Sequence, residues 1–202
     1  MFTHNFEKDA DILIEKILNK ESFAFSRYAD GEYHVMNALS CRGCDGWVVS
    51  SENSLIAKDL TDAFSHNEDN YFYGISCTCC DLPRHTWFKE KLNQSWDKVT
   101  YSSVFVNSNF NKFENLVNTL SDSVVLLVNS RGQDTKYPFA VEELLHIPDD
   151  VITWYEQDSD SIKESVRSLS LKYTNQLFFI SAGPLSEILI SLMYKSNPNN
   201  TY

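Results

Sequence analysis

Two acidic residues and one arginine lie within a single short run near the start of the chain, Arg27-Tyr-Ala-Asp-Gly-Glu32. Asp30 and Glu32 flank a glycine, which lets the chain turn tightly and direct both carboxylates toward one space. Carboxylate oxygens are the ligands that Mg²⁺ and Mn²⁺ prefer, commonly together with the phosphate oxygens of a substrate. This pattern makes Asp30 and Glu32 the candidates to hold a Mn²⁺ or Mg²⁺ ion and the candidate catalytic pair.

Arg27 stands at the end of a predicted strand, where a guanidinium suits a phosphate oxygen. The formal net charge of the chain is -11, and a strongly acidic protein needs a local positive centre to bind a polyanion, which a divalent ion supplies. Two structural interpretations stay open. Asp30 can cap a helix whose positive end Glu32 favours, and Arg27 can form an ion pair with either acid.

Polar residues also follow three later strands that we predict. Asn107 is a candidate to bind a base or sugar, and Ser130 and Arg131 are candidates to bind a diphosphate or the sugar. Ser181 and Gly183 precede a predicted helix, whose free N–H groups can receive a phosphate oxygen. The alternatives are loop hydrogen bonds for Asn107, solvent exposure for Ser130 and Arg131, and an ordinary strand-to-helix turn for Ser181 and Gly183.

Five cysteines cannot all pair within the chain, and we expect thiols. Cys41 and Cys44 form one C-x-x-C pattern, and Cys77 and Cys80 form another. Four thiolates can make a zinc site, but the two pairs are farther apart than the roughly 15 to 20 residues of a zinc ribbon. We therefore expect no stoichiometric zinc on these four residues, which then act as small apolar side chains. The histidines show neither metal-ligand spacing nor a nucleophile motif.

Short β-rich runs alternate with amphipathic segments along the chain. The predicted strands cover residues 22–26, 71–75, 103–107, 123–129, 151–155 and 176–181. The predicted helices cover residues 8–20, 54–64, 86–92, 111–120, 138–146, 159–173 and 184–195. This alternation predicts an α/β fold with one mainly parallel sheet of about six strands and helices on both faces. Ligands of such sheets bind beyond the carboxyl ends of the strands.

The 202 residues are 43% apolar and 22% charged, which is typical of a globular protein and predicts a single domain over residues 1–202. The negative net charge disfavours nucleic acid as a partner. Residues 1–16 lack the basic and apolar regions of a signal peptide, and no stretch reaches about 18 uninterrupted apolar residues. We expect no membrane span and a cytoplasmic location.

The run Phe25-Ser-Arg-Tyr-Ala-Asp-Gly-Glu32 resembles the Arg-aromatic-small-Asp-Gly-Glu signature of metal-dependent glycosyltransferases of the GT-D fold class and of related viral glycosyltransferase domains. Ile180-Ser-Ala-Gly-Pro-Leu185 resembles the last strand-to-helix junction of that family. The resemblance implies that Asp30 and Glu32 bind the divalent ion that holds a nucleoside diphosphate sugar, usually a UDP-sugar. Ala29 stands where the family frequently has glycine, and the family sequence continues through another short strand. The resemblance therefore implies a domain from a longer polypeptide, and a host-cytoplasmic location if the protein is viral.

Together these patterns predict a glycosyltransferase that moves a hexose from a UDP-sugar to a hydroxyl group of a glycan or glycoprotein acceptor. Arg27, Asn107, Ser130, Arg131, Ser181 and Gly183 would bind the donor. Two other classes of function stay open: a non-catalytic module that binds nucleotide sugars or carbohydrate, and an interaction domain stabilised by zinc.

Overall fold

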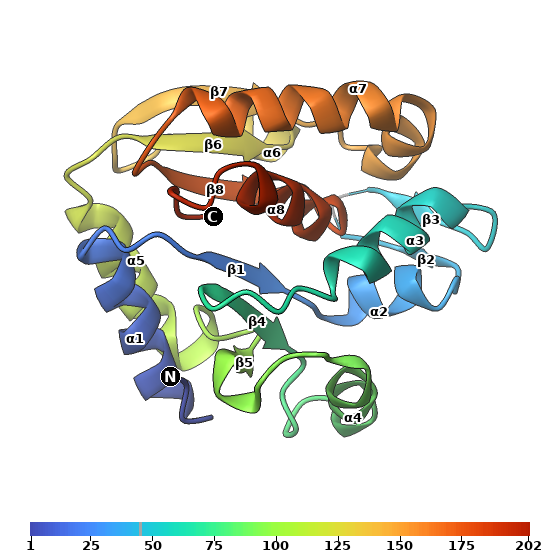
Figure 1. Cartoon of the computed structure of the whole chain (residues 1–202), viewed down its shortest axis with the longest axis horizontal. Coiled ribbons are helices and arrows are strands. Elements are labelled where there is room, and N and C mark those ends of the chain that lie inside the picture. Colours follow the sequence, from blue (N-terminus) through green and yellow to red (C-terminus); the bar gives the residue numbers. More distant parts are fainter. Residues whose placement is uncertain (45) are drawn as a thin grey trace.

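Helices and strands alternate along the whole chain in the computed structural model, which describes residues 1–44 and 46–202 (Figure 1). The strands are β1 (Ala24–Arg27), β2 (Cys41–Arg42), β3 (Val48–Val49), β4 (Tyr71–Ile75), β5 (Val99–Tyr101), β6 (Val124–Val128), β7 (Val141–His146) and β8 (Leu177–Ser181). The α-helices are α1 (Phe6–Leu18), α2 (Asp30–Met36), α3 (Ser54–Ala63), α4 (Leu82–Lys91), α5 (Phe110–Thr119), α6 (Ser130–Gln133), α7 (Val151–Lys172) and α8 (Leu185–Ser196). Two short 3₁₀ turns, η1 (Trp96–Lys98) and η2 (Asn107–Asn109), precede β5 and α5.

Two separate parallel sheets form the centre of the molecule, in the strand orders β1-β4-β5 and β7-β6-β8, and β2 and β3 form a small antiparallel hairpin. The α/β class with helix-flanked parallel strands is confirmed, but the single six-stranded sheet is wrong. The sheets are separate because Thr201 and Tyr202 lie between them. Thr201 accepts the N–H of Phe178 in β8 at 2.8 Å, and Tyr202 accepts the N–H of Phe25 in β1 at 2.8 Å.

Helices cover both faces of these sheets, as Figure 1 shows. β4 and β6 are buried along their full lengths, as expected for parallel strands that are covered on both sides. On one face, residues of α3, α7 and α8 pack with Tyr71, Tyr73, Val125 and Leu127 in the largest apolar cluster. On the other face, α1 packs against β1 and β4. The central strands β4 and β6 are therefore packed on both faces up to their carboxyl ends.

Three predicted elements are wrong, and tertiary contacts explain two of them. Residues 151–155 begin α7, because Asp150 caps that helix at the N–H of Thr153 and Val151, Ile152 and Tyr155 are buried in the core. Residues 138–146 are predicted as a helix, yet 141–146 form β7, because they pair with the edge of β6. The third strand of the first sheet is β5, whereas the predicted segment 103–107 lies just after it in turns.

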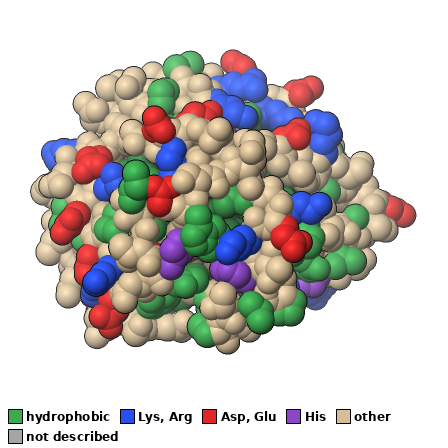
Figure 2. Space-filling model, turned by 60° about the horizontal axis from the view of Figure 1, so that its bottom comes forward, with side chains coloured by type: hydrophobic (Ala, Val, Ile, Leu, Met, Phe, Trp, Pro, Cys, Tyr) green, Lys and Arg blue, Asp and Glu red, His purple; other side chains and the backbone are tan. Residues whose placement is uncertain are grey.

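On the face shown in Figure 2, acidic side chains are scattered among basic ones and among wide uncharged areas. The net charge of -11 is therefore not gathered into one acidic field on this face. In the part of the chain that the structure describes, no helix combines the length and apolar character that crossing a bilayer requires.

Candidate active site

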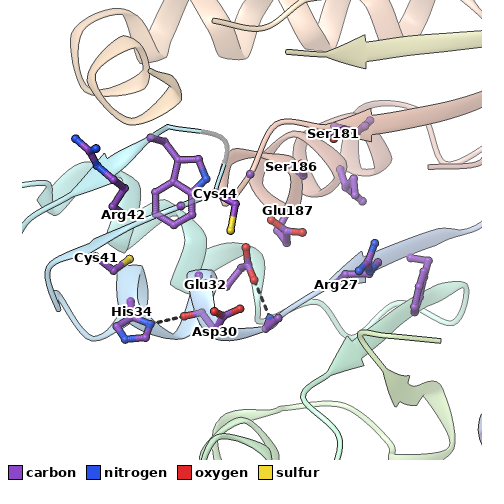
Figure 3. A pocket seen from close by; sticks show the side chains of 18 residues that line it. Arg27, Asp30, Glu32, His34, Cys41, Arg42, Cys44, Ser181, Ser186 and Glu187 are labelled. Carbon is purple, nitrogen blue, oxygen red and sulfur yellow. Dashed lines mark hydrogen bonds between the residues drawn. The ribbon is translucent and has the colours of Figure 1, made fainter. Parts of the chain in front are cut away.

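A cleft of about 600 Å³ opens where β1 and β8 end. Its walls are the first turn of α2, the first turn of α8 and the β2–β3 hairpin (Figure 3). The carboxyl end of a parallel strand is the usual place for a ligand in an α/β fold, and the volume lies within the usual range of roughly 300 to 1,000 Å³ for small-molecule sites. The cleft is therefore the candidate active site.

The junction between β1 and α2 places both predicted acids in this cleft. α2 begins at Asp30, and Ala29 is its N-cap. Glu32 is buried and its Oε2 accepts the N–H of Ala29 at 2.7 Å, which is one half of a capping box. Glu32 thus lies in the first turn of α2, as the helix-start interpretation expected, and in addition bonds the N-cap residue. Asp30 is not the cap, because it is the first helical residue, and it is exposed at the cleft.

Glu187 is a third acid in the cleft, and the sequence analysis missed it. It is the third residue of α8 and only 4% exposed. Its Oε2 is buried and has no hydrogen-bond partner within the described part of the chain. In Figure 3 the carboxyl groups of Glu187, Glu32 and Asp30 face the same space. An unpaired buried carboxyl oxygen is costly, so this residue is the strongest sign of a ligand in the cleft.

The electrostatics of the cleft follow from the burial of two neighbouring acids. Burial raises the pKa of the Glu187 carboxyl well above its ordinary value, and the charge of Glu32 adds to this effect. Burial also raises the pKa of Glu32, although the N–H of Ala29 lowers it in part. Two acids that share a poorly solvated space resist carrying two charges. A cation in the cleft would remove this resistance.

Arg27 lies at the end of β1 and lines the same cleft. Its Nε donates a hydrogen bond of 2.6 Å to the carbonyl oxygen of Ser102, the residue after β5. Within the described residues, no ion pair joins Arg27 to Asp30 or Glu32, so the ion-pair interpretation is wrong. The bond to Ser102 holds the side chain at the cleft and leaves the terminal guanidinium nitrogens for another acceptor.

Ser181 and Gly183 line the wall opposite β1. Gly183 has a φ of +55°, and a Cβ at this position would lie 2.7 Å from Nε1 of Trp47. A Cβ on Gly31 would lie 3.2 Å from the same indole ring. The two glycines between the acids and before α8 therefore make room for Trp47, which is 6% exposed and closes the cleft from the hairpin side.

The other predicted donor-binding residues lie outside the cleft lining. Ser130 directs its N–H and hydroxyl to the carboxylate of Asp149, at 3.1 and 2.7 Å. Arg131 donates to the carbonyl oxygen of Cys44 at 3.2 Å, and thus reaches the hairpin that borders the cleft. Asn107 is exposed at the start of η2, beyond β5. The structure brings Arg27, Asp30, Ser181 and Gly183 together with Glu32 in the cleft. Asn107 and Ser130 lie outside it, and Arg131 contacts the hairpin at its border.

The donor set of the cleft fits a hard divalent cation. Asp30, Glu32 and Glu187 supply carboxylate oxygens, and Oε2 of Glu187 has no hydrogen-bond partner among the described residues. These acids do not form a closed cage, because the only described group of three or more ligand atoms within 4.8 Å of one another consists of cysteines. Mn²⁺ or Mg²⁺ at this place would need water and phosphate oxygens to complete its shell, as Mg²⁺ sites usually do.

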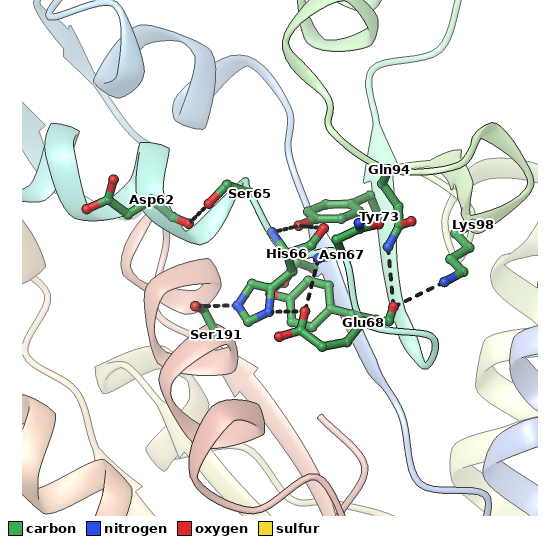
Figure 4. A network of polar contacts seen from close by, with 11 residues as sticks. Asp62, Ser65, His66, Asn67, Glu68, Tyr73, Gln94, Lys98 and Ser191 are labelled. Atoms are coloured by element: carbon green, nitrogen blue, oxygen red, sulfur yellow. Dashed lines mark hydrogen bonds and ion pairs between the residues drawn. The ribbon is translucent and has the colours of Figure 1, made fainter.

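A second polar cluster joins His66, Glu68 and Ser191 (Figure 4). His66 places Nε2 2.7 Å from the Ser191 hydroxyl and Nδ1 2.7 Å from the Glu68 carboxylate. This is the order of a nucleophile, base and acid, which the sequence spacing did not reveal. Ser191 and His66 are buried at 4% and 3% exposure, and His66 stacks on Tyr71. Since neither side chain lines the cleft, we interpret the cluster as a structural link between β4 and α8.

The fold is thus an α/β fold whose parallel strands end at a polar, acid-lined cleft. No family model matches this chain, and no curated protein matches it. Two solved structures share its fold. One is described as the highly conserved domain of unknown function 1792, with a distinct glycosyltransferase fold, and the other is a selenomethionine-substituted structure of that domain. In each case the superposition covers 98% of this chain and 79% of the other chain, with 16% sequence identity and a TM-score of 0.59. The likeness shows that this chain has a glycosyltransferase-like fold.

Proposed function

We propose that the protein is a glycosyltransferase that moves a hexose from a UDP-sugar to a hydroxyl group of a glycan or glycoconjugate. The observation that carries the proposal is the cleft itself. Three carboxyl groups, one of them with a buried oxygen that lacks a hydrogen-bond partner among the described residues, line the cleft together with Arg27 at the carboxyl ends of two parallel strands. A metal-bound diphosphate satisfies both sets of groups at once, and the shared fold supports this class of reaction.

Asp30 and Glu32 would hold Mn²⁺ or Mg²⁺, and Oε2 of Glu187 faces the same space. When bound, the ion would stabilise the negative charge that develops on the departing diphosphate. Arg27, held through Nε on Ser102, would donate its terminal N–H groups to a phosphate oxygen. Glu32 also fixes the first turn of α2 through Ala29, which positions Asp30. Ser181 is exposed at the mouth and would donate a hydrogen bond to the donor.

The direct test is calorimetric titration of the protein with UDP in Mn²⁺ and, separately, in chelator. We expect binding in Mn²⁺ and its loss in chelator, because the carboxylates repel a free diphosphate. Equal affinity in both conditions would overturn the metal-dependent site. Incubation with a panel of UDP-sugars then separates an enzyme from a binding module: an enzyme hydrolyses or transfers one of the sugars, whereas a module binds them and leaves them intact.

A further inference from the structure

Three cysteine sulfurs converge in the loop between β4 and α4. The Sγ atoms of Cys77, Cys79 and Cys80 all lie within 4.8 Å of one another. Cys77 and Cys79 are 3.1 Å apart, and Cys79 and Cys80 are 3.7 Å apart. The C-x-x-C spacing groups Cys77 with Cys80 alone, whereas the structure adds the residue between them.

A tight turn brings these sulfurs together. The carbonyl oxygen of Cys77 accepts the N–H of Cys80 at 3.3 Å and the N–H of Asp81 at 3.0 Å. Asp81 then caps α4 by accepting the N–H of Arg84 at 3.1 Å. On the other side of the turn, Nδ1 of His85 lies 2.8 Å from the carbonyl oxygen of Ser76. The loop is thus fixed at both ends by backbone and side-chain hydrogen bonds, and its three thiols lie close together.

The distances suit one soft metal ion. With metal–sulfur bonds of about 2.3 Å, sulfurs around a tetrahedral ion lie about 3.8 Å apart, so the cluster needs only small side-chain rotations to bind. Thiolates favour Zn²⁺ and Cu⁺ over Mg²⁺, Ca²⁺ and Mn²⁺. Cys77 is buried while Cys79 and Cys80 are exposed, which leaves an open side for a water ligand.

We propose that Cys77, Cys79 and Cys80 form a three-thiolate site for a soft d¹⁰ ion, Zn²⁺ or Cu⁺. On binding, each thiol loses its proton to solvent and each sulfur forms one bond to the ion, with no change of oxidation state. This site differs from a four-cysteine zinc site on both C-x-x-C patterns. Cys41 and Cys44 line the cleft instead, and in the described chain they are not part of the converging group. The proposal does not depend on the proposed transferase function.

The test uses the full chain, reduced and freed of metal. Titration with Co²⁺ reports sulfur ligands through thiolate charge-transfer bands, and Zn²⁺ then displaces Co²⁺. A separate arm measures Cu⁺ against a coloured competing chelator. Cys79→Ser and Cys80→Ser change exposed residues, so circular dichroism should show folded variants. Cys41→Ser and Cys44→Ser are the matched controls for the other C-x-x-C pattern.

We expect one ion per chain in the wild type. Loss of a residue that only hydrogen-bonds a metal ligand weakens metal binding by roughly 10- to 100-fold. The variants at positions 79 and 80 each lose a ligand itself, so we expect a larger loss of affinity than this. The variants at positions 41 and 44 should bind as the wild type does. Binding of only one of the two ions identifies the ion and supports the site. Absence of tight binding in both arms would overturn the proposal, and so would an equal loss in Cys41→Ser, which would indicate a four-cysteine site.

Discussion

Replacing Glu187 by glutamine should change how stability depends on pH. The side chain is 4% exposed, and burial raises its pKa well above the ordinary value of 4.5. The folded protein therefore keeps this proton at pH values where the unfolded chain has already released it. As a result, Glu187 makes the free energy of unfolding fall as the pH rises above 4.5. Glutamine has nearly the same shape and carries no titrating proton, so Glu187→Gln removes this fall.

The size of the effect follows from proton linkage. Between the unfolded and the folded pKa of one group, the free energy of unfolding changes by up to about 1.4 kcal/mol for each pH unit. The stability of Glu187→Gln relative to the wild type should therefore increase with pH at up to this slope, starting above pH 4.5. Glu32 also has a raised pKa, but it is present in both proteins and its direct contribution largely cancels in the comparison.

Urea unfolding between pH 5 and 8, in the presence of chelator, measures this difference. Glu90→Gln is the matched control, because Glu90 is exposed on α4. The difference in free energy of unfolding between this control and the wild type should be the same at every pH. If the difference between Glu187→Gln and the wild type were also independent of pH, the carboxyl group of Glu187 would be ionised equally in the folded and unfolded states. The cleft would then hold no buried neutral acid, and the argument for a cation there would lose its main support.

Two further predictions concern the cleft. Asp30→Asn and Glu32→Gln should melt near the wild-type temperature, because the glutamine oxygen can still accept the N–H of Ala29. Both should lose Mn²⁺-dependent hydrolysis or transfer by roughly a hundredfold or more, on the order of 3 kcal/mol; full activity at limiting Mn²⁺ would remove that residue from the site. Gly183→Ala should destabilise the protein by about 1–3 kcal/mol in thermal unfolding, more than Gly31→Ala, because its φ is +55° and its Cβ would meet the indole at 2.7 Å. Equal melting temperatures would contradict this packing.

Sequence reasoning located the strands whose burial is continuous. β4 is rich in aromatic residues and β6 consists of Val and Leu alone, and both strands are buried throughout. Elsewhere, contacts decided against local preference. β7 became a strand because β6 offered a free edge, and the β-branched start of α7 became helix because Asp150 capped it. The division into two sheets could not be predicted from the sequence. It arises only because residues 201–202 form backbone hydrogen bonds to β8 on one side and to β1 on the other.

The site was predictable where its residues are adjacent in sequence. Arg27, Asp30 and Glu32 follow one strand, and their chemistry shows in one short run. Glu187 lies on the last helix, and an acid in the first turn of a helix is ordinary, so its type alone gave no signal. The junction before it was identified, and Glu187 stands only two residues beyond Leu185. Its missing partner and burial, however, are properties of the folded structure alone.

The position of residues 201–202 between the two sheets also bears on the order of folding. Thr201 bonds to Glu21, 180 positions earlier in the chain, whereas β1 with β4 and β6 with β7 join segments that are much closer in sequence. Closing a long loop costs more chain entropy than closing a short one, and contacts between distant segments slow folding. Each half-sheet can therefore form before the two are joined. The walls of the cleft belong to different halves, so the candidate site is complete only once the two halves are joined.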